Sequence, residues 1–267
     1  MREFIVRSIS GVLYIAMVFI SMFTSHGVFT GLFFVLALIT LNEFLRLVRL
    51  TSYLSYFLLA AFLYFFSYDV WSLDAVNLLL ILCIFVNLFL LKDLLWASKI
   101  PMYEKKKYIA VILYFISGFV FLTRIPIVHG AYDPKVIVGV FVLIWSNDSF
   151  AYVIGKTFGK HKLIERISPK KTVEGFVGGI LGALIAAVVI YFVMGRYPLW
   201  VWACMALLVS LLGTVGDLVQ SKFKRQAGVK DSGVLMPGHG GLYDRLDSIV
   251  YASPFIYAFL EITDHVS

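Results

Sequence analysis

The chain has 267 residues, of which 61% are hydrophobic and only 15% are charged, whereas soluble domains have about 25% charged residues. This composition excludes an ordinary soluble domain and predicts an integral membrane protein. The formal net charge of +7 does not indicate a nucleic-acid partner, because nearly all basic residues fall in segments that one side of a membrane would hold.

Nine apolar runs are candidate membrane-spanning helices, since a helix needs about 20 residues to cross a bilayer. They cover residues 8–24, 28–45, 53–69, 75–91, 108–128, 135–155, 175–194, 199–216 and 248–263. All but three of the 23 Lys and Arg residues then fall on the side of the N-terminus, the exceptions being Arg124, Lys135 and Arg196. By the positive-inside rule, we expect an all-α, polytopic membrane protein of about nine transmembrane helices, with the N-terminus cytoplasmic and the C-terminus outside.

Polar residues are distributed unevenly along these runs. Residues 1–134 are predicted to form an N-terminal scaffold of five transmembrane helices with few ionisable groups. Residues 135–267 are predicted to contain four transmembrane helices, two long cytoplasmic loops and the catalytic residues. In the seventh run Gly178 and Gly182 stand four residues apart, a spacing that favours close packing of helices.

The carboxylate of Asp148 lies in the sixth apolar run, in the sequence WSNDSFAY. A charged side chain in the middle of a membrane helix costs at least about 2.5 kcal/mol, so such residues are rare and typically functional. The alternative is a side chain that extends to the membrane surface or pairs with a nearby lysine.

The sequence SPKKTVEG begins at Ser168 and precedes the seventh run. Lys170 and Lys171 supply positive charge, and Ser168 and Thr172 supply hydroxyl groups next to the first amides of a helix. This combination favours phosphate binding. A positive-inside anchor followed by a helix cap would have the same sequence.

The end of the eighth run has a second polar pattern. If this run continues as a helix, Asp217, Ser221 and either Lys224 or Arg225 lie on one face. An anion, a hydroxyl group and a cation would then share one surface. A ladder of surface ion pairs would give the same pattern.

Asp244 and Asp247 stand three residues apart at the start of the ninth run and would share a helical face. Converging carboxylates repel each other unless a cation joins them, and oxygen ligands select hard cations such as Mg²⁺. Gly240 and Gly241 allow main-chain amides to approach an anion. His239 has no second His or Cys nearby, so we interpret it as a hydrogen-bond donor to phosphate or as a group that closes the loop.

The run SKFKRQAGVKDSGVLMPGHGGLYDRLD, residues 221–247, resembles the signature of the phosphatidate cytidylyltransferases, also called CDP-diacylglycerol synthases. SPKKTVEG and the aspartate of NDSFAY resemble further motifs of this family, whose members have nine spans. The resemblance is strong from about residue 145 onward. Gln220 departs from it, because many members have Glu there, and we do not count it as a metal ligand.

The resemblance implies a reaction of CTP with phosphatidate that gives CDP-diacylglycerol and pyrophosphate in phospholipid biosynthesis. It also implies Mg²⁺, with a second cation possible, and a homodimer in a bacterial cytoplasmic membrane with the active site facing the cytoplasm. It places catalytic roles on Asp217, Lys224, Arg225, Lys230, Asp231, Asp244, Arg245 and Asp247. It places substrate binding on Asp148, Ser168, Lys170, Lys171, Thr172, Ser221, His239, Gly240 and Gly241. The implied metal ligands are Asp217, Asp244 and Asp247.

Three other functions are alternatives for a membrane protein with this sequence. A CTP-dependent polyprenol or phytol kinase shares pieces of these motifs, but it would also need a group that deprotonates or orients an alcohol. A CDP-alcohol phosphatidyltransferase is excluded because its motif needs an Asp-Gly pair, which this chain lacks. A secondary transporter would place its acids at mid-membrane in repeated halves, whereas these acids cluster near one surface.

Overall fold

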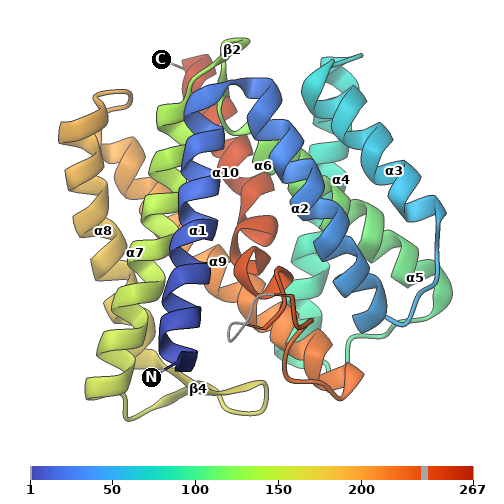
Figure 1. The fold of residues 1–267 in the computed structure, drawn as a ribbon, viewed down its shortest axis with the longest axis vertical. Helices are drawn as coiled ribbons and strands as arrows, with labels where there is room; N and C mark the ends of the chain where they lie inside the picture. Colours follow the sequence, from blue (N-terminus) through green and yellow to red (C-terminus); the bar gives the residue numbers. More distant parts are fainter. Residues whose placement is uncertain (1, 236–239, 267) are drawn as a thin grey trace.

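The computed structural model describes residues 2–235 and 240–266, which form a bundle of helices (Figure 1). The first part of the chain forms α1 (Arg2–Thr24), α2 (His26–Leu47), α3 (Leu54–Leu63), the π-helix η1 (Tyr64–Tyr68), α4 (Leu73–Trp96), α5 (Glu104–Ile109), the π-helix η2 (Ala110–Ile116) and α6 (Ser117–Arg124). The second part forms α7 (Pro134–Phe158), α8 (Val173–Met194), α9 (Leu199–Ala227), the 3₁₀ turn η3 (Tyr243–Arg245) and α10 (Asp247–Val266).

Helices occupy the positions of all nine predicted spans in the described part of the chain. Within residues 2–235 and 240–266, six helical stretches are long and apolar enough to cross a membrane, namely α2, α4, the continuous α5–η2–α6 stretch, α7, α8 and α9. Shorter apolar helices cover Ser10–Thr24 and Leu54–Tyr68. The chain is therefore a mostly helical, polytopic membrane protein, and the exact count of nine spans stays a prediction.

Two small antiparallel sheets correct the expectation of a purely α-helical chain. One pairs β1 (Ile127–Val128) with β2 (Ala131–Tyr132), and the other pairs β3 (Lys162–Ile164) with β4 (Ser168–Thr172). The second sheet contains the lysine-rich SPKKT segment, which is extended because its backbone groups find partners across the hairpin. The strand therefore fixes the direction of the lysine side chains before α8 begins.

Local sequence signals explain where several helices begin and end. Ser25 accepts a hydrogen bond from the amide of Val28 (3.2 Å) at the start of α2, and Thr172 accepts one from Gly175 (3.1 Å) at the start of α8. Both side chains satisfy amides that the first turn of a helix leaves without partners. Gly228 ends α9 with a φ of 77°, a left-handed conformation that glycine adopts without strain.

The two chain ends lie at opposite ends of the bundle, and the N-terminus shares its end with the β3–β4 hairpin (Figure 1). Helix α10 runs through the middle of the bundle, with α7 and α8 to one side and α3, α4 and α5 to the other (Figure 1). A single hydrophobic core includes residues from both predicted regions of the chain. The boundary at residue 134 is therefore not a boundary in space, and the division of roles between the two regions stays a prediction.

Glycine allows α8 to pack closely against α7, as the sequence predicts. A Cβ atom on Gly178 would lie 2.5 Å from Cδ1 of Ile154, and one on Gly182 would overlap the side chain of Phe150. Because α7 carries Asp148 and α8 follows the lysine-rich strand, this contact fixes the distance between two of the predicted motifs.

Replacing Gly178 with Leu is expected to lower the stability of the bundle by about 1–3 kcal/mol, because the new side chain needs space that Ile154 occupies. The matched control is Gly31→Leu on α2, where an added Cβ would have no atom within 4 Å apart from its chain neighbours and the backbone of its own helix. Thermal unfolding in detergent measures both variants. Equal midpoints for the two would contradict the proposed role of Gly178 in packing.

Candidate functional site

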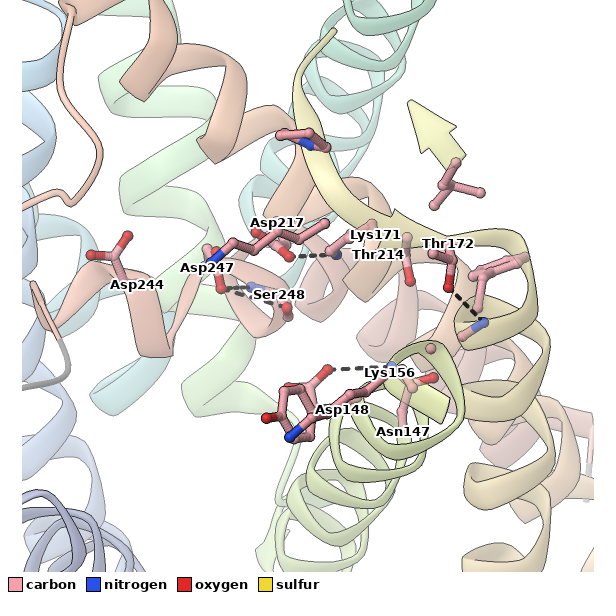
Figure 2. A pocket seen from close by; sticks show the side chains of 18 of the residues that line it. Asn147, Asp148, Lys156, Lys171, Thr172, Thr214, Asp217, Asp244, Asp247 and Ser248 are labelled. Carbon is pink, nitrogen blue, oxygen red and sulfur yellow. Dashed lines mark hydrogen bonds and ion pairs between the residues drawn. The ribbon is translucent and has the colours of Figure 1, made fainter. Parts of the chain in front are cut away.

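A cavity of about 720 Å³ opens at the end of the bundle that carries the β3–β4 hairpin. Side chains from α7, the hairpin, α8, α9 and the segment from η3 into α10 line it (Figure 2). Ten residues with predicted roles are among them: Asp148, Lys170, Lys171, Thr172, Asp217, Lys224, Asp231, Asp244, Arg245 and Asp247. The structure therefore brings four separate stretches of sequence into one polar site.

Of the five aspartates that line this cavity, three come from three different helices, namely Asp148 from α7, Asp217 from α9 and Asp247 from α10 (Figure 2). Asp217 forms an ion pair with Lys171 of β4. Asp247 is only 6% exposed, and it accepts a hydrogen bond of 2.8 Å from the amide of Ser248. Asp217 and Asp247 are close enough to repel each other, which favours a cation between them when the site is in use.

Asp244 has a different environment, because donors surround both of its carboxylate oxygens. Oδ1 accepts bonds from Lys224 Nζ (2.6 Å) and Gln220 Nε2 (3.0 Å). Oδ2 accepts bonds from the amides of Ser232 and Gly241 (both 3.0 Å). Burial raises the pKa of Asp244, but Lys224 and these amides outweigh burial and hold that pKa below its ordinary value.

The shared helical face predicted for Asp244 and Asp247 is wrong. Asp244 lies in the 3₁₀ turn η3, and α10 begins only at Asp247. The reason is that the Asp244 carboxylate binds the amides of Ser232 and Gly241, which holds the chain in a turn before the helix starts. The two side chains line the same cavity (Figure 2) but have different partners, because Asp247 accepts a bond from the amide of Ser248 and from none of the Asp244 donors.

The acids of the cavity indicate metal binding, and their contacts in the structure decide which of them could hold an ion. Among residues 2–235 and 240–266, no group of three His, Cys, Asp or Glu side chains is arranged to hold one ion. Asp217, Asp244 and Asp247 all line the cavity. Donors occupy both oxygens of Asp244, whereas fewer donors contact Asp217 and Asp247. These two offer the oxygen ligands that hard cations prefer, so their chemistry fits Mg²⁺, and metal binding stays a prediction.

Basic side chains also line the cavity. Lys170 and Lys171 extend from β4, and Arg245 extends from η3. The sequence reasoning missed Lys156 and Lys162, which also line the cavity; both belong to the basic segment around GKTFGKHK, and this local clustering was the available signal. Several cations in one cavity suit a ligand with several phosphate groups.

Other described residues with predicted roles do not line the cavity, namely Ser168, Ser221, Arg225, Lys230, Gly240 and Gly241. Two of them support it. Ser221 Oγ donates to Asp217 Oδ1 (3.3 Å), and Arg225 Nε donates to the carbonyl of Ile167 (3.4 Å), which joins α9 to the hairpin. His239 lies outside the described residues.

Sequence reasoning also missed Glu43, which lies on α2 in the predicted scaffold. Its carboxylate accepts hydrogen bonds from the amides of Leu242 (3.0 Å) and Tyr243 (2.8 Å) and from Ser232 Oγ (2.8 Å). The only signal was an acid in an apolar helix next to Arg46. Its partner segment follows about 190 residues later, so local sequence could not indicate the contact.

Comparison with known proteins identifies the family of this chain. A family model described as "Cytidylyltransferase family" matches residues 5–263. The chain belongs to the cytidylyltransferase family. The resemblance inferred from residues 145–267 is thus confirmed, and the match extends through the first half of the chain.

Individual relatives within the cytidylyltransferase family carry a more specific name. A phosphatidate cytidylyltransferase of Bacillus subtilis (strain 168) is 36% identical over 242 residues, covering 88% of this chain and 89% of that protein. Phosphatidate cytidylyltransferases of Staphylococcus aureus (strain COL) and Staphylococcus haemolyticus are 47% and 45% identical over 121 residues. These two matches cover 45% of this chain and 46% of each relative, so the aligned part spans about half of their length.

Proposed function

We propose that this protein is a phosphatidate cytidylyltransferase, which forms CDP-diacylglycerol and pyrophosphate from CTP and phosphatidate. The observation that carries the proposal is the cavity in which Asp148, Asp217 and Asp247 meet Lys170 and Lys171 at one end of a membrane bundle. The names of the relatives and the family membership support it.

The proposed reaction is attack of a phosphate oxygen of phosphatidate on the α-phosphorus of CTP. A bond forms between that oxygen and the α-phosphorus, the bond from the α-phosphorus to the bridging oxygen of the β-phosphate breaks, and pyrophosphate leaves. A phosphate oxygen is already ionised near neutral pH, so the protein needs no general base. What it must overcome is the repulsion between two anions.

The basic residues would reduce this repulsion. Lys170 and Lys171 on β4 and Arg245 on η3 lie on different elements around the cavity, so they could hold phosphate groups of two ligands in one orientation. The cavity volume of about 720 Å³ falls within the range of about 300–1,000 Å³ that is typical of ligand pockets.

Asp217 and Asp247 are the residues that would hold Mg²⁺, with Asp148 nearby on α7 as a candidate for a second cation. When bound, the metal would neutralise phosphate charge as a Lewis acid. We assign Asp244 to the support of the loop instead, because five donor contacts from Lys224, Gln220, Ser232 and Gly241 already surround its oxygens.

The membrane setting fits a lipid substrate. The diacyl chains of phosphatidate would stay among the apolar helices while its headgroup enters the polar cavity. The positive-inside rule supports a cytoplasmic position for this cavity, where CTP is present, and we propose that the membrane is a bacterial cytoplasmic membrane. A homodimer stays a prediction.

Incubation of the purified protein with radiolabelled CTP, Mg²⁺ and phosphatidate tests the function directly. We expect label to enter the lipid extract only when phosphatidate is present. Diacylglycerol with the same acyl chains is the matched control, because it lacks the attacking phosphate. Label that appears with diacylglycerol, or no label with phosphatidate, would contradict the proposal.

A further inference from the structure

Glu43 is a buried carboxylate of α2 that contacts the loop between α9 and α10. Its side chain is 6% exposed overall, and a buried charge is costly unless hydrogen-bond donors surround it. Oε1 accepts from the amide of Leu242, and Oε2 accepts from the amide of Tyr243 and from Ser232 Oγ. All three donors belong to the loop between α9 and α10. The carboxylate therefore joins the stretch around Ser232 to the stretch around Leu242 and Tyr243.

The loop fits closely over this carboxylate because two of its residues are glycine. A Cβ on Gly233 would lie 2.9 Å from Cδ of Glu43, and one on Gly241 would lie 2.6 Å from Oε2. Real Cβ atoms essentially never make contacts this short, so any larger residue would push the loop off Glu43. The loop sequence is thus adapted to a side chain of the distant α2 helix.

Aromatic packing holds the same turn from the same helix. The ring of Phe44, which follows Glu43, contacts the ring of Tyr243 with centroids 5.7 Å apart. The hydroxyl group of Tyr243 lies 2.7 Å from that of Tyr114 on η2. The turn η3 is therefore fixed by its backbone amides through Glu43 and by its aromatic side chain through Phe44 and Tyr114.

The residues that bind Glu43 also bind Asp244. Ser232 Oγ lies 2.8 Å from Glu43 Oε2 and 3.1 Å from Asp244 Oδ2, although its single proton serves one acceptor at a time. The amide of Gly241 donates to Asp244 Oδ2, and the next two amides donate to Glu43. Asp247, which faces the cavity, follows only four residues after Tyr243.

We propose that Glu43 is a positioning residue for the reaction. Glu43 is not among the residues that line the cavity, so it acts through η3, which places Asp247 against Asp217 and directs Asp244 toward Lys224. A displacement of about 1 Å in reacting groups can lower a rate about 100-fold. The reaction itself is the function proposed above, and the positioning role rests on it.

Replacing Glu43 with Gln keeps the shape but turns an amide NH₂ toward donors that need an acceptor. We expect kcat to fall 10- to 100-fold while KM for CTP changes less than threefold, because the lysines of β4 are not moved. Ser232→Ala removes one donor and leaves α2 intact, so we expect a fall of about 3- to 10-fold. The matched control is Glu104→Gln, whose side chain is 72% exposed, and it should have wild-type kcat.

Hydrogen exchange of the purified variants, measured without substrate, gives a readout that does not depend on activity. We expect faster exchange in Glu43→Gln for the amides of residues 240–247, with α7 and α8 unchanged. A general loss of stability would instead raise exchange throughout the bundle and lower kcat in proportion to the folded fraction.

Two results would overturn the positioning role: wild-type kcat in a folded Glu43→Gln protein, or unchanged exchange in residues 240–247. If Glu43→Gln does not fold, the same measurements on Ser232→Ala decide the question. A wild-type protein that does not label phosphatidate would overturn the proposed function, and the exchange measurement would then decide the role of Glu43 in the loop by itself.

Discussion

Replacing Asp247 with Asn should lower CTP-dependent labelling of phosphatidate by at least about 1,000-fold, because the variant loses a negative charge that we assign to cation binding. The fold should survive this change. Asp247 is nearly buried and close to Asp217. Removing one of the two negative charges removes a repulsion that destabilises the folded state. Activity in detergent, with thermal unfolding of the same sample, measures both effects.

The combination of lost activity and retained stability separates a functional acid from a structural one. Asp69→Asn, an exposed acid that follows η1 and does not line the cavity, is the matched control and should keep full activity. Turnover of Asp247→Asn within about tenfold of wild type would contradict the assigned role. The assigned role would also be contradicted if the thermal unfolding midpoint of Asp247→Asn fell as far as that of Gly178→Leu, because the lost activity would then follow from unfolding.

Lys171→Ala is expected to lower kcat/KM for CTP by about 100- to 1,000-fold. Lys171 forms an ion pair with Asp217 inside the cavity, and its substitution leaves Asp217 without that partner and removes a candidate phosphate ligand. The side chains of this ion pair are 30% and 31% exposed, so the pair itself contributes little energy. The expected loss comes from the missing donor to phosphate, because removing one such donor from an active site lowers the rate by about 100- to 1,000-fold. Steady-state kinetics at several CTP concentrations measures the effect.

Lys105→Ala provides the comparison, because Lys105 is an exposed lysine of α5 that does not line the cavity. It removes the same charge and should leave kcat/KM unchanged. If both variants lose activity equally, the effect comes from net charge at the membrane surface and the assignment of Lys171 is wrong. If neither loses activity, Lys171 serves only as a positive-inside anchor.

Much of the site could be predicted from sequence because its residues occur in short patterns. The helix that continues beyond the eighth apolar run is confirmed as α9, and Ser221 does bind Asp217 on the same face. Lys171 and Thr172 line the cavity, and their role in substrate binding stays a prediction. In each case, neighbours within one helix or one strand decided the geometry.

The rest depended on contacts between segments that are far apart in the chain. Asp244 was expected on the same helical face as Asp247, but the donors on Ser232 and Lys224 hold it in a turn. Glu43 looked like one of the few acids of a scaffold helix, and its role became visible only when the loop carrying Tyr243 was placed against it. Periodicity reports the faces of helices and does not report which loop covers them.

The position of the transferred label distinguishes transfer of a cytidylyl group from transfer of a terminal phosphate. CTP labelled at the α-phosphate and CTP labelled at the γ-phosphate are incubated in parallel with the protein, Mg²⁺ and phosphatidate, and the lipids are extracted. We predict that only the α-label enters the lipid and that the γ-label is released in pyrophosphate. Transfer of the γ-label to lipid would contradict this account and would indicate a CTP-dependent lipid kinase.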